Sequence, residues 1–411
     1  MLSVNYGNPT YCHCQTTSFI WSKTMKLSKL LLSVAAPLLV FQLSGCGDGN
    51  SVTVYNPKTP AYSTIIEEVD NYLAEHQQDN QPGLSILIRK DGEVVYKGSK
   101  GLANKHTGER ITDSTGFRIA SVSKPFTALA VMQLVESGQV QLSDTLDQHI
   151  EEIPSAYASI TMHQLLSHQS GIPDYINDTD NLALLDDLTN VQLLALAVAN
   201  DEDELEFTPG TDADYSNTGY VLLAEVVKRV TNMSLPEYLQ FEFYDKLGMT
   251  NSYMIDENRE MGDYGEAVAL SHADTADVYA IGRENITFNA LIYGSSGQVS
   301  SINDMNVFLD ALADEQIVSQ QTLTQMTQKV SAISEIGDYG LGWLTGTGNY
   351  WHNNKYTHTN DYWHSGGYGG YRSILSISPE LGLEVVVLSN GGEETQPRTW
   401  DILEIARNFY R

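Results

Sequence analysis

The sequence predicts a mixed α/β fold in which a mainly helical segment separates two strand-forming parts of one domain. Short apolar or alternating runs that favour strands lie near both ends of the folded body, at 84–97 and at 340–389. Between them, apolar residues recur mostly at helical spacing. Strand-rich ends around a helical middle indicate a discontinuous α/β domain, residues 61–120 and 290–411, with an inserted all-α domain at 121–289.

The strand segments are short and are separated by turn residues. Their predicted bounds are Leu84–Ile88, Glu93–Lys97, Gly340–Leu344, Tyr371–Ile377 and Leu383–Ser389. Asp91-Gly92 stands between the first two, and this dipeptide favours the tight turn of a β-hairpin. Pro379–Gly382 is the predicted turn between the last two.

The helical segments carry apolar residues three and four positions apart, so that one face of each helix can be buried. Helices are predicted over Tyr62–Gln77, directly after Ser121, over Leu222–Val230 and Leu235–Lys246 on either side of Asn232, over Asn303–Ala313, and over Trp400–Tyr410.

Residues 25–45 are predicted to form a signal peptide. Met25-Lys-Leu-Ser-Lys29 is a short cationic start, and the apolar stretch Leu30–Leu43 is too short to cross a bilayer comfortably. Both features suit a secretory signal. Residues 1–24 are expected to lie upstream of the true start.

The predicted signal ends in Leu43-Ser-Gly-Cys46, which resembles the bacterial lipobox, where the cysteine is lipidated and becomes the new N-terminus. Cys46 is therefore the expected lipidation site, and residues 46–60 the tether to a membrane. A plain secretory signal with an incidental cysteine is the alternative. The prediction is an exported lipoprotein of the periplasm or the outer surface.

The folded body is acidic and contains no cysteine. The chain of 411 residues has 52 Asp and Glu against 23 Lys and Arg, a net charge of −29. This charge disfavours a nucleic-acid partner, because phosphate binding needs a basic surface. Cys12, Cys14 and Cys46 are the 3 cysteines, so no disulfide and no cysteine nucleophile is available after them. The histidines lack paired ligand spacing and no Gly-x-Ser-x-Gly occurs, so we expect no metal, no cofactor and no α/β-hydrolase site.

Ser121-Val-Ser-Lys124 is the first candidate for chemistry. A serine three residues before a lysine, at the start of an apolar helical run, places the hydroxyl and the amine on one helix face. No other lysine in the chain has a serine at this spacing. A serine is a weak nucleophile until a neighbouring base takes its proton, and burial can lower the pKa of an amine. Alone, the motif is also typical of a polar first turn, with Ser121 as a cap and Lys124 in solvent.

Two further motifs follow along the chain. Tyr215-Ser-Asn217 stands directly before a long apolar helix, and its phenol and amide, two residues apart in an extended segment, can face the same way. His364-Ser-Gly-Gly367 belongs to a glycine-rich strand that lets another backbone or a substrate approach closely. Each motif is weak alone, since Tyr175-Ile-Asn177 and His106-Thr-Gly108 match as well.

In this order, the three motifs resemble the serine β-lactamase and penicillin-binding superfamily, specifically its branch of class C β-lactamases and D-alanyl-D-alanine carboxypeptidases. Histidine replaces the lysine of the third motif, as in streptomycete-type DD-peptidases. The resemblance covers roughly residues 61–411. It implies an α/β fold of the β-lactamase/transpeptidase type: an antiparallel sheet flanked by N- and C-terminal helices, with an inserted all-α domain.

The resemblance also implies three catalytic residues. Ser121 is the expected nucleophile, which forms an acyl-enzyme with the substrate. Lys124 and Tyr215 are expected to take its proton and pass it to the leaving group. Which of the two is the general base stays open.

The remaining implied roles concern substrate binding. Asn217 is expected to hold the amide of the acyl side chain. His364, Ser365 and Gly366 are expected to bind the substrate. The alternative role for His364 is to polarise Tyr215. The backbone N–H groups of the nucleophilic serine and of Gly367 are expected to form the oxyanion hole.

The resemblance implies that a monomer acts on D-amino-acid peptides, β-lactams or related amides. This chain departs from the carboxypeptidase at one position. There an arginine holds the terminal carboxylate of the peptide, whereas this chain has Trp343 and Leu344. Arg372 or Lys355 can substitute for that arginine, although neither is aligned with it. A carboxylesterase on the same fold is the alternative enzyme. A catalytically inactive cell-envelope binding protein is the alternative of another class.

Overall fold

The computed structural model describes residues 63–105, 107–177, 190, 205–255, 292–334, 336–350, 354–356 and 360–411. Residues 61–411 form one compact unit. The predicted signal peptide, the tether and Cys46 lie outside the described residues.

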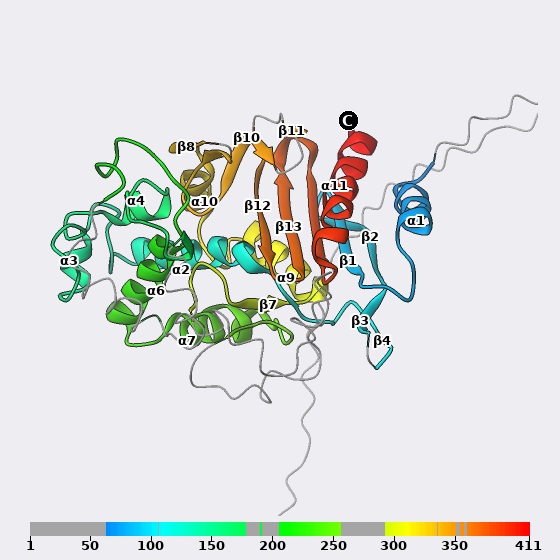
Figure 1. Ribbon diagram of the computed structural model, residues 1–411, viewed down its shortest axis with the longest axis horizontal. Helices are drawn as coiled ribbons and strands as arrows, with labels where there is room; N and C mark the ends of the chain where they lie inside the picture. The colour runs from blue at the N-terminus through cyan, green and yellow to red at the C-terminus, as the bar shows by residue number, and fades with distance from the viewer. Residues whose placement is uncertain are drawn as a thin grey trace, which may run out of the picture. The chain divides into compact units, whose positions relative to one another are not determined.

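An antiparallel sheet joins the two ends of this unit (Figure 1). Its strands are β1 (Leu84–Lys90), β2 (Glu93–Lys100), β8 (Ser331–Ile333), β9 (Gly337–Tyr339), β10 (Leu344–Tyr350), β11 (Asn354–Tyr356), β12 (Tyr362–Tyr368), β13 (Tyr371–Ser378) and β14 (Leu383–Ser389). Within the described ranges their order is β2-β1-β14-β13-β12-β10-β9-β8, with β11 beside β10. The predicted antiparallel sheet is confirmed.

The first two strands form the predicted hairpin. Asp91 and Gly92 make its turn with φ of +53° and +80°, values that Gly and Asp tolerate better than branched residues. On its other side β1 pairs with β14, so that Leu84 lies opposite Ser389. The sheet is therefore built by strands from both ends of the unit formed by residues 61–411.

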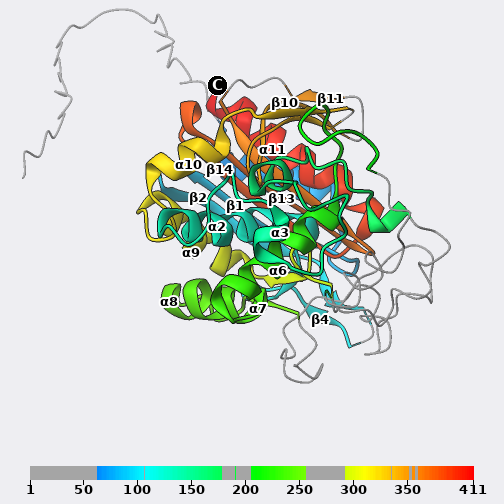
Figure 2. The same ribbon diagram turned by 90° about the vertical axis from the view of Figure 1, so that its left-hand side faces the viewer.

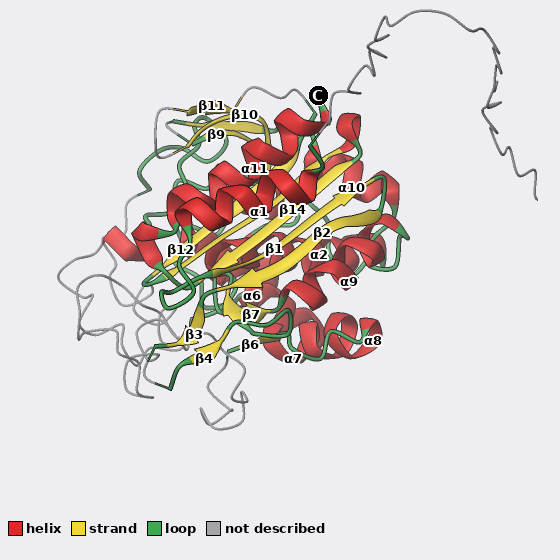
Figure 3. Ribbon diagram, turned by 90° about the vertical axis from the view of Figure 1, so that its right-hand side faces the viewer, coloured by secondary structure: helices red, strands yellow, loops and turns green. Residues whose placement is uncertain are grey.

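Helices α1 (Ile65–His76) and α11 (Gln396–Tyr410) cover one face of the sheet (Figure 3). Thr64 caps α1 through a capping box with Glu67. The buried stripes of both helices pack in one cluster with alternate residues of β1 and β14: Ile65, Val69, Leu73, Ile402, Leu403, Ala406, Ile86, Ile88, Val385 and Val387. The predicted terminal helices flanking the sheet are confirmed.

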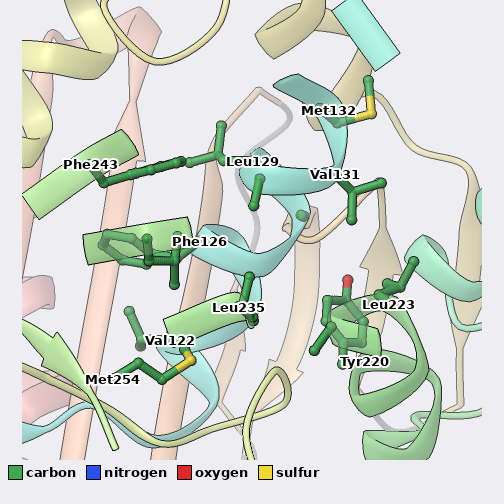
Figure 4. Close-up of a cluster of buried hydrophobic side chains, with 14 of the residues drawn as sticks. Val122, Phe126, Leu129, Val131, Met132, Tyr220, Leu223, Leu235, Phe243 and Met254 are labelled. Atoms are coloured by element: carbon green, nitrogen blue, oxygen red, sulfur yellow. The ribbon is translucent and has the colours of Figure 1, made fainter. Parts of the chain in front are cut away.

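Helix α2 (Ser123–Glu136) is the centre of the core on the other face. Its residues from Ser123 to Met132 are all buried, so protein surrounds this part of the helix on every side. α6 (Asn217–Thr231) and α7 (Leu235–Leu239) pack around it (Figure 4). The same cluster includes Leu87 and Val386 of the sheet, so one hydrophobic core extends through both predicted parts of the chain.

The other elements surround this core. They are β3 (Leu102–Asn104), β4 (Glu109–Arg110), β5 (Phe117–Arg118), η1 (Ala120–Val122), α3 (Leu146–His149), α4 (Met162–Leu166), η2 (Tyr175–Asn177), η4 (Gln240–Tyr244), α8 (Asp245–Leu247), β6 (Tyr253–Met254), β7 (Gln298–Ser300), α9 (Ile302–Ala313), α10 (Gln320–Thr327), η8 (Pro379–Leu381) and η9 (Gly392–Glu394). Figure 2 views the helical side, where α3, α6 and α7 lie. Asn232 ends α6 in the left-handed conformation, φ +58°, which confirms the predicted break between two helices.

One predicted strand, Gly340–Leu344, is wrong. β9 ends before Gly340 and β10 begins at Leu344, and the residues between them turn, with the Gly340 N–H donating to Trp343 O at 2.8 Å. Gly342 has φ of +90°, and a Cβ on it would lie 2.3 Å from the Cβ of Ala128. Gly342 therefore lets this turn press against α2, and Gly340 lets it approach Met326 O, which would lie 2.1 Å from a Cβ on Gly340.

Candidate active site

Ser121 and Lys124 meet at the N-terminal end of α2. Ser121 lies in the 3₁₀ turn η1 just before the helix, and Lys124 is the second helical residue. The turn begins at Ala120 with φ of +49°, a region that costs a non-glycine residue about 1 kcal/mol or more. Lys124 Nζ lies 3.3 Å from Ser121 Oγ. The serine is partly accessible, whereas the lysine is fully buried.

The amine of Lys124 has a complete set of acceptors. Besides Ser121 Oγ, Asn217 Oδ1 lies 2.7 Å and Ser295 O lies 3.0 Å from Nζ. An ammonium has three N–H donors, so the charged form is satisfied despite its burial. Burial nevertheless lowers the pKa of Lys124 to about 7, and the nearby negative charge of Asp174 acts against this shift.

Tyr215 and Asn217 approach the lysine from the start of α6. The intervening Ser216 caps this helix, because its Oγ accepts the Gly219 N–H at 3.2 Å. Asn217 is then the first helical residue, and the Tyr215 ring lies in the extended segment before it. Lys124 Nζ is 4.6 Å from the centre of that ring. The phenol and the amide therefore both lie against Lys124.

The predicted glycine-rich strand passes directly beside the serine. A Cβ on Gly366 would lie 2.2 Å from Ile119 O and 3.0 Å from Ser121 N, so only glycine permits this approach. β10 pairs with β12 at Leu344–Trp363 and Thr345–Tyr362. Beyond Trp363, no described strand pairs with β12 on this side, so the edge from His364 to Tyr368 faces the pocket.

His364 is buried and neutral. Its Nδ1 is 2.7 Å from Ser365 O, and because a carbonyl only accepts, Nδ1 must carry the proton. Nε2 then accepts from the Tyr339 hydroxyl at 3.2 Å. Burial and the charge of Lys124 lower the pKa of His364 to about 3. Its ring centre is 6.4 Å from that of Tyr215, so the histidine packs behind the tyrosine.

A pocket of about 670 Å³ opens on these residues. Its lining comprises Ser121, Tyr215, Ile336, Leu344, His364–Gly369, Arg372, Ser373, Gln396, Pro397, Thr399 and Trp400. Lys124 and Asn217 are not in the lining; they lie behind the serine. Arg372, one of the two substitutes considered for the missing arginine, is at the pocket and donates from Nε to Gln396 Oε1 at 3.0 Å. The side chain of the other, Lys355, lies outside the described part.

Two residues of the site, His168 and Asp174 in the loop after α4, belong to none of the predicted motifs. His168 Nδ1 accepts the Ser216 N–H at 3.1 Å, His168 O accepts the Asp214 N–H at 3.0 Å, and its ring lies 4.4 Å from that of Tyr215. Asp174 Oδ2 accepts from Asn217 Nδ2 at 2.7 Å. The Ser-His-Gln-Ser-Gly-Ile-Pro-Asp segment is a polar turn with no local sign that it lies against residues 214–218.

Neither a metal site nor a membrane-spanning helix is present in the described ranges. No group of three or more His, Cys, Asp or Glu side chains there is placed to hold a metal ion. None of the helices in those ranges is long and apolar enough to cross a bilayer.

Several known proteins resemble this chain. Penicillin-binding protein 4* of Bacillus subtilis (strain 168) is 27% identical over 341 residues, which cover 79% of this chain and 71% of that protein. Protein flp of Staphylococcus aureus (strain MRSA252) is 26% identical over 344 residues, 81% of this chain and 64% of that protein.

Solved structures agree. An octameric penicillin-binding protein homologue from Pyrococcus abyssi has a TM-score of 0.67 at 27% identity, covering 83% of this chain and 76% of that one. D-amino acid amidase from Ochrobactrum anthropi SV3 has a TM-score of 0.67 at 23% identity, covering 83% and 98%. The model of the Beta-lactamase family matches residues 69–407. This match, together with the sheet and its flanking helices, confirms the predicted resemblance at the level of the serine β-lactamase and penicillin-binding superfamily: the chain belongs to the Beta-lactamase family.

Proposed function

We propose that this protein is a serine hydrolase that forms an acyl-enzyme at Ser121. The observation that carries the proposal is the buried amine of Lys124, which lies 3.3 Å from Ser121 Oγ and whose pKa is lowered to about 7. An amine with that pKa is partly neutral near pH 7 and can accept a proton. The serine then attacks the carbonyl carbon of a substrate that is bound in the pocket.

The contacts of Lys124 support its role as the base. A neutral amine has two N–H groups and one electron pair. Asn217 Oδ1 and Ser295 O can accept the two N–H groups, so the electron pair is left to the Ser121 hydroxyl. Tyr215 is then expected to carry the proton between Lys124 and the leaving group, because its ring lies over the amine at the pocket.

The proposed reaction has two steps. As Ser121 Oγ bonds to the carbonyl carbon, its proton passes to Lys124, and the bond from that carbon to the leaving nitrogen breaks as the nitrogen is protonated. Water then attacks the carbonyl carbon of this ester and gives a proton to Lys124, the bond from that carbon to Ser121 Oγ breaks, and Oγ takes up the proton as the carboxylic acid leaves. The backbone N–H groups of Ser121 and Gly367 are proposed to hold the oxyanion, which is supported by the close approach of β12 to η1.

The proposed substrates are amides of D-amino acids, such as D-amino-acid peptides, or β-lactams. The similarity to a penicillin-binding protein and to a D-amino acid amidase supports this class. The position of β12 also supports it, because residues 364–368 of this strand line the pocket and an extended peptide-like substrate can lie along them. We further propose that the protein is an exported lipoprotein attached through Cys46 and that it acts as a monomer.

The test is mass spectrometry of the intact protein after reaction with a fluorescent penicillin and, separately, with a short p-nitrophenyl ester. We expect an adduct on Ser121 that is absent from Ser121→Ala. If neither reagent forms an adduct, the proposal of a serine hydrolase is refuted, and the alternative of a catalytically inactive binding protein remains. Turnover of a D-Ala-D-Ala peptide, of nitrocefin or of the ester then decides between carboxypeptidase, β-lactamase and carboxylesterase.

A further inference from the structure

The carboxylate of Asp174 lies against the amide that contacts the buried lysine. Asp174 Oδ2 accepts hydrogen bonds from the Asn217 backbone N–H at 3.1 Å and from Asn217 Nδ2 at 2.7 Å. The other end of the same amide, Oδ1, lies 2.7 Å from Lys124 Nζ. The Asn217 amide therefore joins a carboxylate to the amine.

The loop that carries Asp174 is bonded along its length to the segment that carries Asn217. Besides the His168 contacts, Ser216 Oγ donates to Ile172 O at 3.2 Å and Thr218 Oγ1 donates to Pro173 O at 2.8 Å. A Cβ on Gly171 would lie 2.2 Å from Phe207 O, so this loop is also tightly packed against the chain upstream of the segment that carries Asn217. The position of Asp174 is thus set by the fold rather than by its own charge.

The chemistry of the groups decides which way the amide faces. An ionised carboxylate accepts hydrogen bonds and cannot donate, so the donor Nδ2 of Asn217 must face Asp174. The acceptor Oδ1 must then face Lys124. Without Asp174 the amide can turn over, and its Nδ2 would donate to the electron pair of the neutral amine in competition with the Ser121 hydroxyl.

We propose that Asp174 is a positioning residue for acylation: it fixes the Asn217 amide so that the electron pair of Lys124 is left to Ser121. This inference rests on the function proposed above. It assigns a role to a residue that touches neither the pocket nor the reacting serine, because Asp174 acts through Asn217.

The charge of Asp174 has a second effect, on the pH dependence. The titratable groups that face Lys124 within the described residues are Asp174, Tyr215, Tyr220, His168 and His364. Burial and the charge of Lys124 lower the pKa of both histidines, so they are neutral. Asp174 attracts the ammonium and raises the pKa of Lys124 against the effect of burial. Removal of its charge therefore favours the neutral amine.

The experiment measures the second-order rate of Ser121 acylation between about pH 5 and 9 for Asp174 variants. In the wild type this rate should rise with pH along an acid limb, as Lys124 loses its proton, and then reach a plateau. Asp174→Asn removes the charge. We expect it to shift the acid limb of the pH–rate profile by about one unit to lower pH and to lower the plateau rate about tenfold. Asp174→Glu keeps the charge but displaces it, so the limb stays near that of the wild type and the plateau falls. Asp174→Ala lowers the plateau about a hundredfold.

The matched control is Asp212→Asn, an equal change of charge in the same stretch as Tyr215. Asp212 is exposed and its Oδ1 accepts the N–H of the next residue, Ala213, at 2.8 Å. We expect this variant to keep both the limb and the plateau of the wild type.

The outcomes separate this inference from the proposed function. If the wild type forms no adduct on Ser121, the function itself fails. If the wild type is acylated and a folded Asp174→Asn keeps both limb and plateau, only the role of Asp174 is overturned. Should Asp174→Asn not fold, Asp174→Glu decides, since a wild-type plateau in that variant would equally overturn the inference.

Discussion

Gly366→Ala tests whether the contact between β12 and η1, the turn that carries Ser121, controls the rate of acylation. The added Cβ would lie 2.2 Å from Ile119 O, 2.5 Å from Ser373 Oγ and 3.0 Å from Ser121 N. Ser373 can rotate, but the other two atoms belong to the backbone of η1 and its flank. Ordinary contact begins at 3.4 Å, so the strand or the turn has to move by about 1 Å.

A displacement of about 1 Å at the reacting atoms can lower the rate about a hundredfold, whereas overpacking lowers the free energy of unfolding by about 1–3 kcal/mol. We therefore expect Gly366→Ala to fold, with a lower unfolding midpoint, and to acylate about a hundredfold more slowly. The assays are the burst rate with a p-nitrophenyl ester and thermal unfolding followed by circular dichroism.

Gly219→Ala is the matched control. Gly219 is also buried and lies near the site in the first turn of α6, and a Cβ added to it would have its nearest neighbour at 3.6 Å, which is ordinary contact. This variant should keep its acylation rate and gain up to about 1 kcal/mol from helix propensity. A folded Gly366→Ala that acylates as fast as Gly219→Ala would show that the described approach of β12 to Ser121 does not govern the reaction.

Three further predictions concern stability and attachment. The pKa of Lys124 is lowered on folding, so its burial destabilises the protein below pH 7, and this cost disappears as the pH rises toward 10.5. Lys124→Met should therefore have a higher free energy of unfolding in denaturant than the wild type. This excess over the wild type should shrink by about 1.4 kcal/mol per pH unit between pH 7 and 10.5. An excess that stays constant with pH would contradict this burial effect. His168→Phe keeps a ring beside Tyr215 but leaves the Ser216 N–H without its acceptor, which should cost about 1–3 kcal/mol, and more than His168→Asn costs. Equal losses in both variants would argue against the hydrogen bond. Cys46→Ser should release the protein from membranes in cell fractionation; unchanged partitioning would refute the lipid anchor.

The local part of the site is readable from the sequence, because it depends on neighbours along the chain. Ser121 and Lys124 are three residues apart on one helical turn, and Tyr215 and Asn217 two apart before a helix, so spacing alone places each pair. The hairpin around Asp91-Gly92 is predictable for the same reason. The order of the motifs then identifies the family.

The rest depends on contacts between distant segments. His168 and Asp174 belong to the site only because their loop packs against residues 214–218, and a single sequence holds no record of that pairing. The wrong prediction of a strand at Gly340–Leu344 has the same cause, a contact with a distant segment. The reason for Gly342 is the methyl group of Ala128 on α2, which is far away in the chain.

The pairing of β1 with β14 has a consequence for how the protein is made. During synthesis the β1–β2 hairpin emerges first, and β14, the strand that covers the other edge of β1, is made much later. Until then β1 presents free backbone N–H and C=O groups, which favour pairing with other chains. A chain that stops before residue 383 keeps this edge open, so truncated products should aggregate or require chaperones, whereas removal of residues 1–60 leaves both pairing strands present.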